Sequence, residues 1–399
     1  MAGGRSTVAR ATFHLPLEIA IEILSRLPVK SLLRFKSVCK TWYELMKAPD
    51  FISKHLQTQV TLNSTSLLVT TYNGKTKNFA VSFLPNDGFS GPIDSPFFTV
   101  ENYHNIGGIC NGLVCISPYR YGYNMILCNP STRQFREIPK CAYEYEFRRI
   151  MMVSVGFGFH PSAHDYKLIK IVLYSIPIRK YNVRADLYVM STGTWREIDV
   201  NKLSSFFGEM NELGESDNIV VIDDFSASAV LNGVFYWPAR ILGTYKAVVM
   251  SFDMGNEVFR KIKTPECLDG TWDQIYRRFT ELDDKLALVV SPDERGFDVW
   301  VLNENENSWT NQVKGASFPR IASDTRNRER TVVVGGKNGE LLVTKHKVSG
   351  DLKLFSYDTR TRQTKDLWFG HIHYKSRVYL YAGTGTLVPA MQANEVSLN

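Results

Sequence analysis

Residues 15–56 read LPLEIAIEILSRLPVKSLLRFKSVCKTWYELMKAPDFISKHL, and this stretch decides how the whole chain is interpreted. A leucine or isoleucine recurs every fourth residue from Leu15 to Leu27, which is the spacing of one face of a helix. Pro16 suits the first turn of that helix, and Pro28 ends it because proline cannot donate a helical hydrogen bond. The stretch therefore begins with a short amphipathic helix.

Two further helices are expected after Pro28. The second begins near Ser31, and the third ends before Pro49. Their apolar residues favour one side, at Leu32, Phe35, Cys39, Trp42, Leu45 and Met46. Three short helices cannot bury this much apolar surface by themselves, since domains of about 40 residues are usually marginal. The pattern predicts either a partner protein that covers the surface or an ordinary helical domain that packs on its own neighbour.

The same stretch resembles an F-box, the module that docks a substrate receptor onto the Skp-type adaptor of a cullin ubiquitin ligase. The resemblance rests on matches in register from Leu15-Pro16 to His55, including Val38-Cys39-Lys40, Pro49 and Phe51. It implies that no catalytic residue, metal or cofactor is needed in this module. The residues that it implies for adaptor binding are Leu15, Pro16, Ile19, Ile23, Leu24, Leu27, Pro28, Leu32, Leu33, Val38, Cys39, Trp42 and Leu45.

Composition and charge describe a globular chain with a basic first segment. The 399 residues are 44% hydrophobic and 22% charged, as in soluble proteins with a large core. Of the net charge of +7, residues 1–56 carry +5, from nine basic and four acidic side chains. This uneven charge favours an acidic protein partner for the helices over nucleic acid, whose readers usually have a more basic face.

We expect the protein in the cytoplasm, the nucleus or both. No apolar run approaches the ~20 residues of a membrane span, and Glu18 and Glu22 interrupt the only stretch that resembles a signal peptide. The six cysteines fit a reducing compartment. Cys110, Cys115, Cys128 and Cys141 lack the paired spacing of a zinc site, so buried thiols are the preferred interpretation. His371 and His373 form too small a set for a metal site.

After residue 57 the pattern changes to short β-strands with two repeated elements. Residues 66–71 and 79–84 flank Asn73-Gly74, a dipeptide typical of tight hairpin turns in which both residues take positive φ. Five further hairpins share a turn residue that is followed by an aromatic or equivalent position. The second of these hairpins is shorter than the others by one residue. Their turn residues, separated by 61, 63, 50 and 55 positions, are Asn129, Met190, Asp253, Asn303 and Asp358.

A second element, a two-residue turn that feeds an apolar strand, precedes four of these hairpins, at Asn111-Gly112, Asn232-Gly233, Asp283-Asp284 and Asn338-Gly339. Each repeat has the length of a four-stranded propeller blade. We therefore expect an α+β chain with a three-helix module and an all-β propeller of about six blades. Residues 377–381 and 386–388 would complete the first blade and leave no open sheet edge. A β-sandwich is the alternative.

The β region also resembles the F-box-associated domain of plant F-box proteins, a broad family that includes the S-locus F-box-like proteins. The phrases that carry the resemblance are GICNGLVC at 108–115, NPST at 129–132, and GFGF at 156–159 followed by DYK at 165–167. True kelch repeats have a double glycine in every blade. Outside the N-terminal tail this sequence has only Gly107-Gly108 and Gly335-Gly336, so the β region is at most related to kelch repeats. The expected domains are a flexible segment 1–13, an F-box 14–56, a propeller-like domain 57–390 and a tail 391–399.

The sequence offers no recognisable catalytic motif. Gly156 and Gly158 resemble the start of a dinucleotide-binding loop, but they lie within an expected strand and are interpreted as packing residues. We therefore expect a non-catalytic receptor with no cofactor that binds a protein target and presents it for ubiquitination. The alternatives are a scaffold that binds the adaptor without forming a ligase, and a pollen S-locus type receptor for secreted ribonucleases.

Two insertions are candidates for target binding, because long loops in compact β domains often carry binding residues. One is acidic, with no lysine or arginine between Lys202 and Arg240. The other is rich in the aromatic and arginine side chains that are frequent at interfaces. The alternative for both is a solvated loop. The candidate residues are Glu209, Glu212, Glu215 and Asp217 in the first, and Tyr121, Tyr123, Tyr145 and Arg148 in the second.

Overall fold

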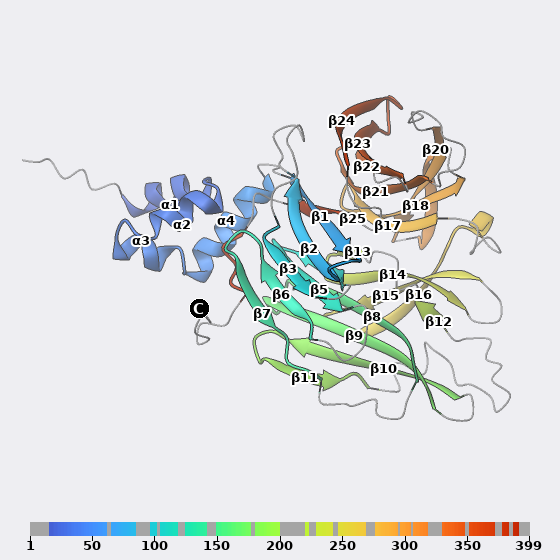
Figure 1. Ribbon diagram of the computed structural model, residues 1–399, viewed down its shortest axis with the longest axis horizontal. Helices are drawn as coiled ribbons and strands as arrows, with labels where there is room; N and C mark the ends of the chain where they lie inside the picture. Colours follow the sequence, from blue (N-terminus) through green and yellow to red (C-terminus); the bar gives the residue numbers. More distant parts are fainter. Residues whose placement is uncertain are drawn as a thin grey trace, which may run out of the picture.

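The computed structural model describes most of the chain between residues 16 and 390. The described residues are 16–61, 65–84, 96–101, 104–118, 124–141, 149–176, 180–199, 220–222, 229–241, 246–268, 276–293, 296–304, 306–317, 329–347, 351–371, 377–382 and 386–390. Helices come first and strands follow, so the predicted α+β order is confirmed. Figure 1 shows the helices gathered at one end of the β domain.

Four helices, rather than the three expected, form the N-terminal module. They are α1 (Leu17–Ser25), α2 (Val29–Phe35), α3 (Lys40–Leu45) and α4 (Pro49–Thr61). The third helix ends before Pro49, as predicted, but Pro49 also begins a fourth helix that was not expected, because a proline in the first turn needs no N–H donor. Likewise α2 begins at Val29, directly after Pro28, and not near Ser31. Helix α4 continues five residues past the expected end of the module at residue 56.

The described strands form antiparallel meanders, most of them with four strands. One sheet contains eight strands, but a single parallel pair, Leu282 with Gly336, joins its two halves. Divided there, the described strands make six meanders, and about six blades stays a prediction for the whole domain. The first is β25 (Arg377–Ala382), β1 (Thr65–Asn73), β2 (Asn78–Leu84) and β3 (Phe98–Glu101); the second is β4 (His104–Cys110), β5 (Leu113–Pro118), β6 (Ile126–Asn129) and β7 (Gln134–Glu137).

The other four meanders follow in chain order. The third is β8 (Arg149–His160), β9 (Asp165–Ile176), β10 (Lys180–Val189) and β11 (Thr194–Glu197). The fourth is β12 (Val220–Ile222) and β13 (Ala229–Leu231), both paired with β14 (Val234–Ile241), then β15 (Ala247–Asp253) and β16 (Val258–Lys263), followed by a 3-10 turn at Glu266–Leu268. The fifth is β17 (Tyr276–Leu282), β18 (Lys285–Asp293), β19 (Gly296–Asn303) and β20 (Ser308–Ser317), and the sixth is β21 (Glu329–Lys337), β22 (Glu340–Lys347), β23 (Asp351–Asp358) and β24 (Thr364–His371).

Strand β25 completes the first meander, as the sequence predicts for residues 377–381. It pairs antiparallel with β1, so the first meander is built from both ends of the β region. Val378 lies opposite Val69 in this pairing, and both are buried in one cluster. The second half of the prediction was wrong, because residues 386–388 form no strand. They lie instead as a buried segment beside the helices and the second meander.

The repeated hairpin has one geometry in several meanders. The side-chain oxygens of Asn129, Asp253 and Asp358 each accept hydrogen bonds from the two amides that lie two and three residues further on. In each turn the fourth residue after this position has positive φ, which closes the loop. The Asn73 hairpin forms the same four-residue turn, with positive φ at Lys77, rather than the tight Asn-Gly turn that was predicted.

The hairpin of the third meander corrects the predicted repeat. Val189 pairs with Thr194 as Asn129 pairs with Gln134, so the turn residue is Val189 and not Met190. The hairpin is therefore as long as the others, and the two spacings around it are 60 and 64 residues. Since valine cannot accept hydrogen bonds through its side chain, Asp165 from the neighbouring turn accepts the Ser191 amide hydrogen instead.

The four two-residue turns that the sequence predicts are present, and they share one geometry. Asn111-Gly112, Asn232-Gly233 and Asn338-Gly339 have positive φ at both residues, and so does Asp283-Asp284. Such turns match the right-handed twist of the strands they connect. The repeat found in the sequence therefore corresponds to a repeated local structure.

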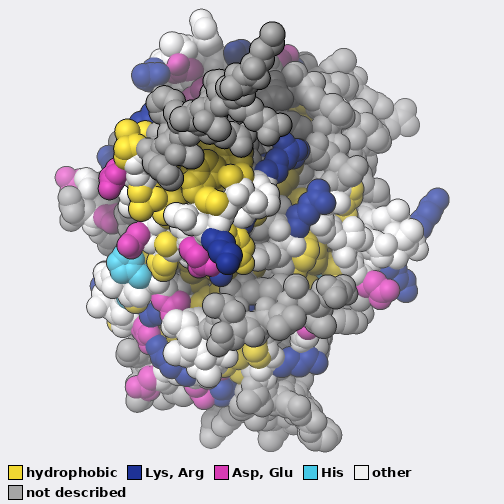
Figure 2. Space-filling view, turned by 90° about the vertical axis from the view of Figure 1, so that its left-hand side faces the viewer, with side chains coloured by type: hydrophobic (Ala, Val, Ile, Leu, Met, Phe, Trp, Pro, Cys, Tyr) yellow, Lys and Arg dark blue, Asp and Glu magenta, His cyan; other side chains and the backbone are white. Residues whose placement is uncertain are grey.

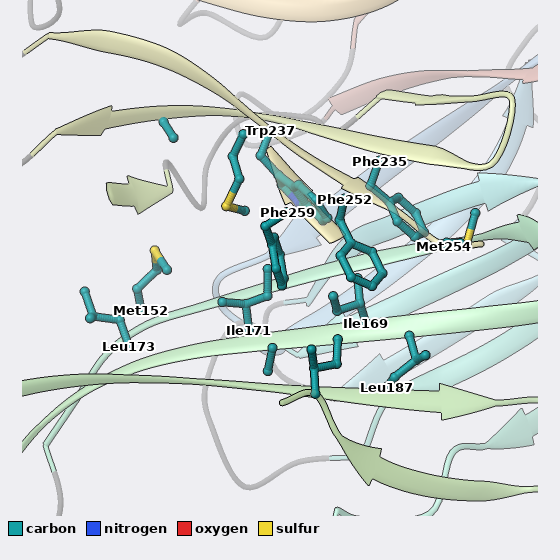
Figure 3. Close-up of a cluster of buried hydrophobic side chains, with 14 of the residues drawn as sticks. Met152, Ile169, Ile171, Leu173, Leu187, Phe235, Trp237, Phe252, Met254 and Phe259 are labelled. Carbon is teal, nitrogen blue, oxygen red and sulfur yellow. The ribbon is translucent and has the colours of Figure 1, made fainter. Parts of the chain in front are cut away.

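Side chains from neighbouring meanders fill the spaces between the sheets. Figure 3 shows the largest such cluster, in which Ile169, Ile171 and Leu187 of the third meander face Phe235 and Phe252 of the fourth. Gly156 lies inside β8 under this cluster, as expected of a packing residue rather than a nucleotide-binding loop. Burial is what holds adjacent blades together, because hydrogen bonds run mainly within each meander.

Candidate functional site

The helical module has its own small core. Leu24, Val29, Leu32, Met46 and Phe51 are each no more than 3% exposed, and they form one cluster. The Phe35 and Trp42 rings meet edge to face with centroids 5.6 Å apart at its border. Burial of these apolar side chains holds the four short helices together.

Polar contacts join α4 to α1 and to the turn that follows α1, and these contacts stabilise the packing of the helices. Glu22 receives hydrogen bonds from Arg26 and an ion pair from Lys54 of α4, at 2.7 and 2.8 Å. Lys54, which has the larger effect, and Arg26 lower the pKa of the Glu22 carboxyl to about 2, so the carboxylate is charged at neutral pH. His55 donates from Nε2 to the Leu27 carbonyl oxygen at 3.0 Å, which anchors α4 beneath the turn after α1.

The outer surface of this module is apolar to an unusual degree. Among the described residues, six large hydrophobic side chains are strongly exposed, and five of these lie in residues 17–43. Figure 2, which faces the helical end, shows hydrophobic side chains gathered at the surface there. Exposed apolar groups that recur together commonly mark a protein interface. The five, with exposed fractions of 42–61%, are Leu17, Ile19, Ile23, Val38 and Tyr43. We call this set the exposed apolar face; Ile19 and Ile23 share one side of α1, and Leu17 lies on another side of the same helix.

The structure divides the described members of the predicted adaptor-binding set into three groups by their exposure. Leu24 and Leu32 are fully buried, so their side chains hold the helices together and cannot contact a partner. Ile19, Ile23, Val38, Pro16, Pro28 and Cys39 are exposed. Leu27, Leu33, Trp42 and Leu45 are half-buried around the core, and Leu15 lies outside the described residues.

Two residues of the exposed apolar face were absent from the prediction. Leu17 and Tyr43 fall off the stripe of apolar residues by which the helices were recognised, and off-stripe positions normally face water. An apolar residue off the stripe was the signal that could have revealed them. Lys47 lies over the Tyr43 ring at 4.7 Å, which holds that ring in place at the surface.

The two ends of the β domain differ in what they carry. Helix α4 leads into the start of β1, which pairs with the last residue of β25. The Asn129 turn lies at this same end, the helix end, because its side chain binds the segment after β25. Since antiparallel strands alternate in direction, the β5–β6, β7–β8 and β11–β12 connections leave from the opposite end, the far end.

In the sequence, both predicted target-binding insertions fall between strands whose described ends lie at the far end. Residues 119–123 connect β5 to β6, residues 142–148 connect β7 to β8, and residues 200–219 connect β11 to β12. The candidate side chains themselves, Tyr121, Tyr123, Tyr145, Arg148, Glu209, Glu212, Glu215 and Asp217, lie outside the described residues. The strands that flank them are described, and these place the attachment points away from the helices (Figure 1).

The cysteines of the second meander are free thiols in this structure. Cys110, Cys115 and Cys128 lie in β4, β5 and β6, and burial raises the pKa of all three thiols, to about 12 for Cys110 and Cys128. In the part of the chain that the structure describes, no three His, Cys, Asp or Glu side chains come together as a metal site requires.

Comparison with known families identifies both parts of the chain. Residues 13–54 match the F-box domain, and residues 66–388 match the F-box associated beta propeller domain. The chain belongs to the F-box proteins with an F-box-associated β-propeller. Both resemblances noted in the sequence are thereby confirmed. F-box domains generally bind Skp-type adaptors, and proteins of this family are typically adaptor-like receptors.

Relatives of this F-box protein occur in Arabidopsis thaliana. An F-box protein of that plant is 26% identical and aligns over 93% of this chain and 91% of its own length. An F-box/kelch-repeat protein is 28% identical over 73% and 76% of the two chains. Among solved structures, TolB from Acinetobacter baumannii superposes with a TM-score of 0.44 at 11% identity. The superposition covers 84% of this chain and 73% of TolB. No helix among the described residues is long and apolar enough to cross a membrane.

Proposed function

We propose that this F-box protein is the substrate-receptor subunit of a Skp–cullin–F-box ubiquitin ligase. The observation that carries the proposal is the exposed apolar face of the helical module, Leu17, Ile19, Ile23, Val38 and Tyr43, on an otherwise well-packed domain. Exposure of several large apolar side chains to water is energetically unfavourable unless a partner covers them. The Skp-type adaptor to which F-box domains generally bind is that partner.

The remainder of the chain would bind the protein to be degraded. We place target binding at the far end of the propeller, where the connections that hold the acidic and the aromatic candidates leave the sheets. Strand β9, with 12 residues, spans ~40 Å between the two ends at about 3.3 Å per residue. The helices and the target would therefore lie on opposite sides of a rigid domain, with room for the ubiquitin-conjugating machinery beside the target.

The chemistry of ubiquitin transfer would come from the cullin complex, and this chain would contribute position. Holding a target lysine near the loaded conjugating enzyme turns a rare encounter into a frequent one. In this mechanism no side chain of the receptor touches the reacting atoms. What this chain needs is two binding surfaces at a fixed separation.

The test is co-purification of the adaptor with a variant of the exposed apolar face. Ile19→Glu with Ile23→Glu places two charges on residues that are each 49% exposed, so the helices should still fold. Truncating a central apolar anchor typically costs ~2 kcal/mol, which corresponds to roughly 30-fold weaker binding for each such anchor. We expect adaptor recovery to fall accordingly while circular dichroism shows unchanged helix and strand content.

A matched control changes the same kind of residue elsewhere. Met151 in β8 is 45% exposed, and it is the strongly exposed large hydrophobic residue that lies outside the helices among the described ones. Met151→Glu should leave adaptor binding unchanged. Full adaptor recovery with the Ile19/Ile23 double variant would refute the docking surface. Recovery of the adaptor without a cullin from cells with the proteasome blocked would favour the scaffold function over the ligase.

A further inference from the structure

Residues 386–390 lie between the helical module and the propeller, and they contact both. Thr386, Leu387, Val388 and Ala390 are at most 9% exposed, although they belong to no helix or strand. The side chain of Leu387 belongs to the core cluster of the helices, together with Leu24, Leu32 and Phe51. The next residue, Val388, belongs to a different cluster, which is formed by the second and third meanders.

The contacts of successive residues thus alternate between the two sides of the segment. In an extended chain, successive side chains point to opposite sides, so one neighbour reaches the helices while the other reaches the propeller. Ala390 again joins the propeller cluster. Ile52 of α4 packs against both clusters, which makes the two cores nearly continuous across the segment.

A single side chain of the propeller holds the segment by hydrogen bonds. Asn129 donates from Nδ2 to the carbonyl oxygens of Thr386 and Val388, at 2.9 and 2.7 Å. Its Oδ1 accepts from the amides of Ser131 and Thr132, as in the other hairpins. Asn129 is fully buried, so both of its polar atoms are satisfied by the chain itself.

The equivalent positions in other meanders show which part of Asn129 is special. Asp253 and Asp358 form the same turn through a carboxylate oxygen, so the turn needs only an acceptor. The amide nitrogen of Asn129 is needed for the C-terminal segment and not for the turn. A carboxylate at 129 would bring a negative charge against two carbonyl oxygens that it cannot bind.

We infer that residues 386–390 form a clasp that fixes the orientation of the helical module on the propeller. Without the clasp, the helices would lose Leu387 from their core, keep the rest of that core, and move relative to the β domain. The purpose of the clasp rests on the proposed function, since a fixed orientation keeps the adaptor and the target at a constant separation. The clasp itself can be tested with neither partner present.

The experiment measures a distance across the two modules in the full chain. Spin labels enter through an unnatural amino acid at Lys30 of α2 and Lys314 of β20, both of which are exposed. In the unmodified chain, pulsed electron paramagnetic resonance should give one narrow distribution of the distance between the two spin labels. Asn129→Asp should broaden that distribution at least twofold, because it removes both donors while keeping the acceptor of the turn.

Asn73→Asp is the matched control, because Asn73 forms the same turn in an exposed hairpin with its oxygen as the acceptor. It should leave the distribution narrow. Leu387→Asn provides an independent variant, since Leu387 lies outside all sheets and its change cannot disturb a hairpin. It should broaden the distribution as well, with unchanged strand content by circular dichroism.

Narrow, unshifted distributions in both Asn129→Asp and Leu387→Asn would overturn the clasp. A broadened distribution in a variant that still recovers the adaptor supports the clasp and separates it from the docking surface. If adaptor binding fails in the Ile19/Ile23 variant while the distance stays narrow, the docking surface alone has been lost. The two proposals therefore fail in distinguishable ways.

Discussion

At the scale of single residues, close packing between blades decides which positions tolerate change. Gly156 lies in β8 against two fully buried rings, Trp237 and Phe235, whose centroids are 5.4 Å apart. A methyl carbon on Gly156 would lie 2.8 Å from Trp237 Cζ2 and 2.9 Å from Phe235 Cδ1, closer than such atoms approach. The rings have no free space into which to move, because protein interiors are close-packed.

We therefore expect Gly156→Ala to lower the free energy of unfolding by about 1–3 kcal/mol, the usual cost of overpacking. Urea unfolding followed by tryptophan fluorescence measures it. Gly74→Ala is the control, since nothing lies within 4 Å of its added carbon and its φ is not positive, and this change should be neutral or slightly stabilising. Equal stabilities for the two variants would contradict the packing argument.

At the scale of elements, the contact between α1 and α4 makes the helical module sensitive to pH. His55 is fully buried, and burial lowers the pKa of its imidazole below the ordinary value near 6.5. Because Nε2 donates to the Leu27 carbonyl, a second proton would be placed on Nδ1, which is buried and has no hydrogen-bond partner. The Glu22 carboxyl, whose pKa its cationic partners Lys54 and Arg26 lower to about 2, does not titrate in this range.

The sign of the effect is set by linkage. A histidine whose pKa is lower in the folded state binds more protons when unfolded, so stability is complete above pH 6.5 and declines as the pH falls below it. We expect the melting temperature of the helical signal to drop between pH 7.5 and pH 5.5. His55→Gln keeps a donor for Leu27 and removes the titration, so the drop should shrink. An equal drop in the variant would show that His55 is not responsible.

At the scale of the whole molecule, closure by β25 and the clasp are successive steps at the same end of the chain. A protein that stops at residue 385 keeps β25 paired with β1 and loses only the clasp and the tail beyond it. A protein that stops at residue 376 loses β25 and leaves β1 as an open edge, with Val69 and Leu67 uncovered. The two truncations separate closure from orientation.

We expect the protein that stops at residue 385 to keep its strand content with a reduced melting temperature. The protein that stops at residue 376 should unfold or aggregate, because a closed ring loses its mutual contacts when one strand is removed. Gel filtration with circular dichroism distinguishes these outcomes. A stable monomer from the shorter chain, or from one that ends near residue 325, with unchanged strand content per residue would refute closure.

The sequence alone determined the modules and their order, because local periodicity and turn chemistry act over a few residues. The apolar stripe from Leu15 to Leu27 revealed helices, and the paired turn residues at Asn111-Gly112 and Asn338-Gly339 revealed the repeated hairpins. Helix number was missed because Pro49 can either end or begin a helix, and only the packing of Phe51 and His55 beneath α1 decides between them.

The tertiary structure alone decided which apolar residues are inside and where the modules meet. Leu24 and Ile23 are neighbours of the same chemical kind, yet one is buried and the other half exposed, because only one faces the other helices. The partners of Asn129 lie 257 and 259 residues away, and no local pattern encodes a contact over that separation. Burial and long-range hydrogen bonds depend on how distant segments pack, and packing is settled only when the whole chain has folded.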